Sequence, residues 1–246
     1  MQKIDFHKTL AGPGAPATLV GVTKLRFGAY WETSTQGRSG WMGKLTEKAG
    51  LDIDLVAILM QGDGNKKKAV KYVGLDNLDP VDGTVKHTGD AKKGNKKAKV
   101  EQDSEGRTLK ADVEAIEVPD LTKVDLDYNA IFFTVSVMKQ GAMTTGLAQG
   151  LRESNPQRAA EILDKGFQGA KNVEFSVYMD GADGPEYFKI MPDLAGKENC
   201  CLIAKVSRTH PTDRQAPWAI EIFEDMVMIE KGDRAMGQLL DHCRQR

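Results

Sequence analysis

The sequence predicts a mainly β protein: a two-sheet antiparallel β-sandwich with one flanking helix and a C-terminal helical tail. Three observations lead to this fold class. Short runs of strand-forming residues recur along most of the chain, and several alternate apolar with polar residues. Clusters of Gly, Pro, Asp and Asn separate these runs and are typical of turns. Helical spacing of apolar residues is confined to two stretches, and many strands with few helices favour a sandwich.

The predicted strands follow from this alternation. Between Val173 and Met179 every second residue is apolar, so one face of that strand would pack against a core. Turn residues at 79–83 and 180–185 end neighbouring strands. In chain order, the predicted strands are Ala17–Arg26, Asp52–Met60, Ala69–Tyr72, Ala111–Val118, Ala130–Met138, Val173–Met179, Tyr187–Ile190, Asn199–Ser207 and Trp218–Phe223.

Two helices are expected. The first runs from Pro156 to Ala170, with Ser154 or Asn155 as its cap and the proline in its first turn. The second runs from Gly232 to Cys243 and would close the chain. Its apolar stripe either covers the sandwich or binds a partner. The stripe residues of the second helix are Met236, Leu239, Leu240 and Cys243.

Composition limits the class and the compartment of the protein. The chain has 246 residues, of which 40% are hydrophobic and 28% charged, as in soluble globular proteins. No apolar run approaches the roughly 18 residues that cross a bilayer, and the N-terminus lacks a signal-peptide h-region. The cysteines form neither a disulfide framework nor a metal motif. We therefore expect a cytoplasmic protein. Cys200 and Cys201 are adjacent in a predicted strand and would point to its opposite faces, so at most one of them is expected to be buried.

Two lysine runs, at residues 66–68 and 92–99, are either solvated loops or contacts for a phosphate or a nucleic acid. The net charge of −1 argues against a general polyanion binder. The second run has no interleaved aromatic residue on which bases could stack. We therefore do not expect a nucleic-acid partner.

Common enzyme motifs are missing from the sequence. It contains no G-x-S-x-G nucleophile elbow, no P-loop and no H-E-x-x-H. Its four histidines are far apart and form no ligand pair. We expect a protein that is not an enzyme. Hydrolysis at an acidic pocket is a third interpretation, after the calcium-binding and metal-free functions that are described below.

Acidic residues recur at i,i+2 spacing in two predicted strands. Asp52 and Asp54 would project from one face of the first strand, and its intervening apolar residues would face a core. Asp112 and Glu114 repeat the spacing, and Asp90 ends a nearby loop. Two such strands side by side would form an acidic pocket. Such carboxylates are either solvated or neutralised by a hard cation such as Ca²⁺, which takes six to eight oxygen ligands.

The order of these motifs resembles the tellurium-resistance TerD-type family of stress proteins. The most specific part is the block from Asp82 to Asp90, which reads DGTVKHTGD and follows the acidic stretch Leu51–Asp54. Supporting similarity touches most of residues 17–223. It includes Phe167–Asn172, Tyr187–Leu194 and Trp218–Phe223.

The resemblance implies a β-sandwich that binds Ca²⁺ through an acidic cluster, in a cytoplasmic protein tied to tellurite and other stress responses. No enzymatic reaction is established for the family, and its members are thought to be binding or scaffold proteins near the membrane. Carbonyl oxygens of residues 92–107 would complete the metal shell. The carboxylate ligands implied for this chain are Asp52, Asp54, Asp90, Asp112 and Glu114.

The chain also departs from the family pattern. Val56 stands where the family usually has Ser, Ala91 where it has Asn, and residues 111–114 replace a compact Gly-Asp-Asp-Glu. The predicted organisation is a sandwich domain over 1–223, with insertions around 92–107 and 139–154, and a helical tail over 224–246. The first insertion is interpreted as a long, mobile excursion between strands.

These departures leave an alternative function open. The sandwich would then be a metal-free structural or protein-interaction module. Its insertions and C-terminal tail would bind a protein partner or a second copy of the chain. The sequence predicts no transmembrane segment and leaves peripheral membrane association open.

Overall fold

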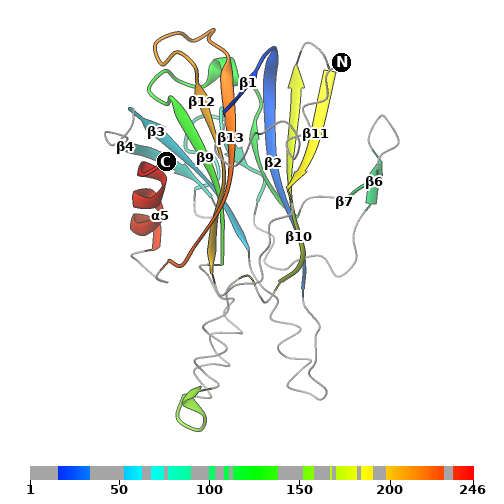
Figure 1. Cartoon of the computed structure of the whole chain (residues 1–246), viewed down its shortest axis with the longest axis vertical. Helices are drawn as coiled ribbons and strands as arrows, with labels where there is room; N and C mark the ends of the chain where they lie inside the picture. The colour runs from blue at the N-terminus through cyan, green and yellow to red at the C-terminus, as the bar shows by residue number, and fades with distance from the viewer. Residues whose placement is uncertain are drawn as a thin grey trace.

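Two β-sheets packed face to face form the body of the computed structural model in Figure 1. The structure describes residues 16–33, 53–62, 68–74, 77–89, 100–102, 108–110, 113–137, 152–157, 167, 170–181, 184–190, 198–229 and 235–246. All strand pairs in the two sheets are antiparallel. The predicted fold class, a mainly β two-sheet sandwich, is confirmed.

The larger sheet, sheet A, has six strands in the order β1-β13-β12-β9-β3-β4. Its strands are β1 (Ala17–Leu19), β13 (Trp218–Val227), β12 (Cys200–Arg208), β9 (Ala130–Ser136), β3 (Asp54–Gln61) and β4 (Lys68–Val73). The smaller sheet, sheet B, has five strands in the order β11-β10-β2-β8-β5. Its strands are β11 (Gly184–Ile190), β10 (Ala170–Gly181), β2 (Val22–Thr33), β8 (Glu114–Val118) and β5 (Lys86–His87).

The first predicted strand is divided in two. Expecting a single strand over Ala17–Arg26 was wrong, because a turn at Val20 and Gly21 separates β1 from β2. Gly21 has a φ of +74°, which glycine adopts readily. Because β1 pairs with β13 and β2 pairs with β10 and β8, this turn carries the chain from sheet A to sheet B.

The main core lies between the two sheets. The rings of Phe27 on β2 and Phe133 on β9 stack across it, with centroids 3.9 Å apart. Ile53 and Leu55 face this core and are fully buried, as the alternation along their strand predicts. Leu51, the third residue expected there, lies outside the described residues.

A second apolar cluster covers the outer face of sheet A. Helix α5 (Ala235–Arg244) packs there with Leu239 and Cys243 fully buried. The predicted apolar stripe is confirmed, since Met236 and Leu240 pack against the same cluster. Sheet A residues in the cluster include Val56, Ile58, Met60, Phe132, Leu202 and Phe223. Consequently β3 is buried on both faces, which the alternation of apolar and polar residues did not predict.

Both predicted insertions and the first predicted helix fall largely outside the described residues. Residues Val100–Gln102 of the first insertion, however, form β6, which pairs with β7 (Thr108–Lys110) just after the insertion in a short two-stranded sheet. Pro156 and Gln157 are helical, but Ala170, the expected end of that helix, is already the first residue of β10. The structure describes no helix that is long and apolar enough to cross a membrane.

Candidate functional site

Glu114, the first residue of β8, places a buried carboxylate between the sheets. At two-residue spacing it shares a face of β8 with Ile116 and Val118, which face the main core, and its side chain is 2% exposed. Its Oε2 accepts a hydrogen bond from the backbone N–H of Leu55 at 3.2 Å. The pairing of β3 with β4 ends at Ala57, so Leu55 has no β4 partner. The carboxylate therefore caps the start of β3 and ties sheet A to sheet B.

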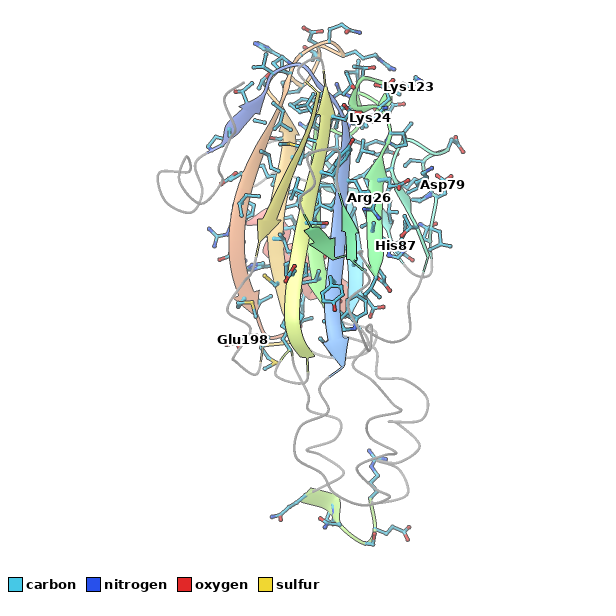
Figure 2. The ribbon with its side chains drawn as sticks, turned by 90° about the vertical axis from the view of Figure 1, so that its right-hand side faces the viewer. Lys24, Arg26, Asp79, His87, Lys123 and Glu198 are labelled. Carbon is cyan, nitrogen blue, oxygen red and sulfur yellow. The ribbon has the colours of Figure 1, made fainter. Side chains whose placement is uncertain are left out.

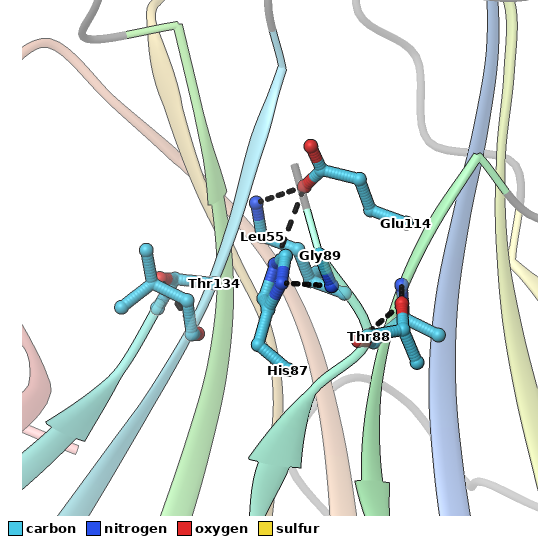
Figure 3. A network of polar contacts seen from close by, with 8 residues as sticks. Leu55, His87, Thr88, Gly89, Glu114 and Thr134 are labelled. Carbon is cyan, nitrogen blue, oxygen red and sulfur yellow. Dashed lines mark hydrogen bonds and ion pairs between the residues drawn. The ribbon is translucent and has the colours of Figure 1, made fainter. Parts of the chain in front are cut away.

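His87 lies beside this carboxylate. It pairs with Ile116 in the β5–β8 register, so its side chain also faces the interior and is 1% exposed. Its Nε2 is 3.4 Å from Glu114 Oε2, although the two are not aligned as a regular hydrogen bond. Its Nδ1 accepts a hydrogen bond from the backbone N–H of Gly89 at 3.0 Å (Figure 3).

The turn at residues 87–89 is held on two sides. Thr88 donates its backbone N–H and its hydroxyl to the carbonyl of Ala115, at 2.9 and 3.1 Å. The Thr88 hydroxyl oxygen accepts the N–H of Ala115 at 3.0 Å. The N–H of His87 donates to the carbonyl of Leu78 at 2.8 Å. Gly89 then takes a φ of +121°, and Asp90 is the next residue in the chain.

The predicted ligands are only partly described. Asp52, Asp90 and Asp112 lie outside the described residues. Asp54 is 7% exposed, so a solvated strand face is wrong for this residue. By alternation it shares the face of Val56 and Ile58, which is covered by the second cluster, and it pairs with Ser136 on β9. Glu114 approaches β3 from the interior, so Asp54 and Glu114 lie on different faces of that strand.

The expected arrangement of the two acidic strands also needs correction. They are not side by side in one sheet, because β3 belongs to sheet A and β8 to sheet B. They meet across the sandwich, through Glu114 and the Leu55 N–H. In the described part of the chain, no three His, Cys, Asp or Glu side chains are grouped closely enough to hold a metal ion.

The model of the TerD domain family matches residues 16–150, which is more than half of the chain. The chain belongs to the TerD family. This match includes β8, β5 and the start of β3, which carry the buried polar contacts.

A solved structure agrees with the fold of this TerD-family protein. A homologue of telluride resistance protein (TerD), SCO6318 from Streptomyces coelicolor A3(2), superposes with a TM-score of 0.53 at 13% identity, covering 85% of this chain and 93% of its own. The protein of unknown function SAV2460 gives a TM-score of 0.48 at 18% identity, with 83% and 92% covered. No curated protein sequence matches the chain.

His87 is the site residue that sequence reasoning missed. The TerD-type block includes it, but no second histidine lies near it in sequence to indicate a ligand pair. Its contact with Glu114 depends on the register between β5 and β8. Figure 2 shows His87 on the same side of the molecule as Asp79, below it in that view.

The thiols of this TerD-family protein are not exposed nucleophiles. Cys200 and Cys201 are both buried, contrary to expectation, because α5 and the core cover the two faces of sheet A. Burial, together with the neighbouring Cys201 and Cys243, raises the pKa of the Cys200 thiol well above its ordinary value. The thiol therefore stays protonated at neutral pH.

Proposed function

We propose that this TerD-family protein is a non-enzymatic, cytoplasmic, calcium-binding protein of the stress response linked to tellurite resistance. The observation that carries the proposal is the buried carboxylate of Glu114. Two further acidic residues lie nearby in sequence. Asp112 precedes Glu114 by two residues, and Asp90 directly follows Gly89, whose backbone N–H donates to His87. The ligands in the proposal are Asp52, Asp54, Asp90, Asp112 and Glu114.

The donor chemistry around Glu114 fits a hard cation. Carboxylate oxygens are the ligands that Ca²⁺ prefers, and its flexible coordination accepts them singly or in pairs. A buried carboxylate costs free energy unless its charge is compensated. The Leu55 N–H compensates the charge on Oε2 in part, and a divalent cation held by neighbouring carboxylates would add to this compensation. Asp54 is on the other face of β3, so experiments must treat it separately from Glu114.

Thermal unfolding with and without calcium tests the proposal. Calcium binds the folded chain and stabilises it by about 2.7 kcal/mol at a concentration of 100 times Kd. We expect millimolar CaCl₂ to raise the melting temperature of metal-stripped protein, and Glu114→Gln to abolish this rise. In the same assay, Asp54→Asn tests whether the carboxylate on the other face of β3 also contributes to the rise in melting temperature with calcium. A melting temperature unchanged by calcium would contradict the proposal.

A metal-free module remains the second candidate, because Oε2 of Glu114 already has protein partners. In that case the insertions and tail bind a protein partner or a second copy. Replacing Asp90 or Asp112 by Asn would then leave stability unchanged in calcium and in chelator alike. Charge reversal on the exposed side of the tail (Asp241→Lys) would abolish assembly, as measured by light scattering on the eluting protein, whereas removing all residues after Phe223 would also cut β13 and uncover the second core. Retained assembly, or calcium-dependent stability, would contradict this candidate.

A further inference from the structure

We propose that His87 is a positioning residue whose neutral imidazole, with its proton on Nε2, holds the backbone of Gly89 against the carboxylate of Glu114. Its consequence for calcium rests on the proposed function, because Gly89 leads directly into Asp90 and Glu114 is a proposed ligand. The arrangement of the imidazole itself is a property of the metal-free protein.

The two ring nitrogens have different neighbours, and the hydrogen bond at Nδ1 indicates the position of the proton. The N–H of Gly89 donates to Nδ1 at 3.0 Å, so Nδ1 offers a lone pair and carries no proton. In a neutral ring the proton is then on Nε2. That nitrogen faces Oε2 of Glu114 at 3.4 Å, with both side chains at most 2% exposed. A proton on Nδ1 would place two N–H groups against each other and break the Gly89 contact.

The ring cannot easily turn away from this position. Thr88 clamps the turn to Ala115 through three hydrogen bonds, and the His87 N–H is held by the Leu78 carbonyl. Gly89 has a φ of +121°, which residues with a Cβ rarely adopt, and in the described part of the chain nothing lies within 4 Å of a Cβ added there. Backbone conformation, not space, therefore requires glycine at this position.

The imidazole thus bridges two segments that each lead to proposed ligands. One segment is the turn that enters Asp90, and the other is the start of β8, with Glu114 and, two residues earlier, Asp112. Residues that orient the metal ligands without contacting the metal themselves typically contribute 10- to 100-fold to metal affinity. A side chain that merely fills the core would contribute to stability without this effect.

Two variants separate the nitrogens. In His87→Asn the shorter amide still offers an acceptor at the place of Nδ1, whereas in His87→Gln the longer amide reaches the place of Nε2. We expect each to weaken calcium binding about 10- to 100-fold in calorimetric titration, because each breaks one half of the bridge. The exposed His210→Gln is the matched control and should bind calcium as the natural chain does. Unchanged affinity in both His87 variants, with a lowered melting temperature, would show a purely structural role and overturn the proposal.

Nitrogen NMR of the metal-free protein tests the arrangement without calcium. We expect an unprotonated Nδ1 and a protonated Nε2, and slow hydrogen exchange of the Gly89 amide that His87→Asn keeps and His87→Gln loses. A protonated Nδ1, or equal exchange of Gly89 in both variants, would overturn the proposal. A natural chain that binds no calcium but gives the expected spectra would contradict the proposed function and leave the positioning role supported.

Discussion

The buried guanidinium of Arg208 lies at one end of sheet A, and Glu114 contacts the opposite end of that sheet. It lies over the ring of Trp218 at 4.6 Å and donates to the backbone carbonyls of Val124 and Arg214. Within the described residues no carboxylate forms an ion pair with it. Burial lowers the pKa of this guanidinium, and the nearby Arg214 adds to the shift. The planar fork of donors therefore joins β12 to two separate loops.

Replacing this arginine by lysine tests the role of the fork. A single ammonium cannot reproduce the two carbonyl contacts and the stacking on Trp218. We expect Arg208→Lys to lower the free energy of unfolding by about 2 kcal/mol in urea denaturation. The exposed Arg214→Lys should change it by less than about 0.5 kcal/mol. Equal losses in the two variants would contradict this account.

Asp120 gives the protein a pH dependence in acid. The Thr122 hydroxyl, at 2.7 Å, lowers the pKa of this carboxyl most, and the Thr122 backbone N–H lowers it further. Because the folded pKa is below the unfolded one, its contribution is present above pH about 4 and is lost as pH falls through the folded pKa. We expect Asp120→Asn to reduce the loss of unfolding free energy between about pH 5 and 3. Asp127→Asn, at an exposed neighbour, should leave that slope unchanged; the same slope in both variants would contradict the assignment.

At the scale of elements, α5 makes the outer face of sheet A a second core. Leu239 and Cys243 are buried against Val56 and Phe132. Polar contacts hold the end of the helix: Lys205 Nζ is 3.3 Å from the Arg246 carbonyl oxygen, and Asp225 pairs with Arg246. Burial of β3 on both faces follows from this helix, so the tail is part of the folded body.

Truncating the helix contact tests this docking. We expect Leu239→Ala to lower the free energy of unfolding by about 2–4 kcal/mol, because it leaves a cavity under α5. Hydrogen exchange should show the loss first in α5 and on the outer residues of β3. Loss of protection confined to the core between the sheets would contradict it.

Gly237 in the same helix is the matched contrast. It is exposed, and an added Cβ would meet no atom within 4 Å. We expect Gly237→Ala to raise the free energy of unfolding by about 0.5–1 kcal/mol through helix propensity alone. A decrease would mean that the helix is not docked in this orientation.

At the scale of the whole molecule, local patterns predicted the strands and missed the long-range contacts. Alternation located β10, β12 and β13 within a few residues, because each has a core face. It failed at Val20 and Gly21, where a turn moves the chain between sheets, and along β3, where a distant helix covers the second face.

The candidate site shows the same limit. Acidic spacing identified Asp54 and Glu114, but it could not show that they lie on different faces of β3. The contact of Glu114 with Leu55 spans 59 residues, and that with His87 depends on strand register. Such contacts follow from topology, which spacing within one strand does not encode.

The central claim is that calcium binds at Glu114. Calorimetric titration of metal-stripped protein with calcium, on the natural chain and two matched β8 variants, tests it most directly. Glu117→Gln is the control, because Glu117 is on the outer face of β8, beside Arg26 and Lys86. We predict saturable binding by the natural chain and by Glu117→Gln, and a loss of about tenfold or more in Glu114→Gln. A flat titration of the natural chain, or equal binding by both variants, would contradict the claim.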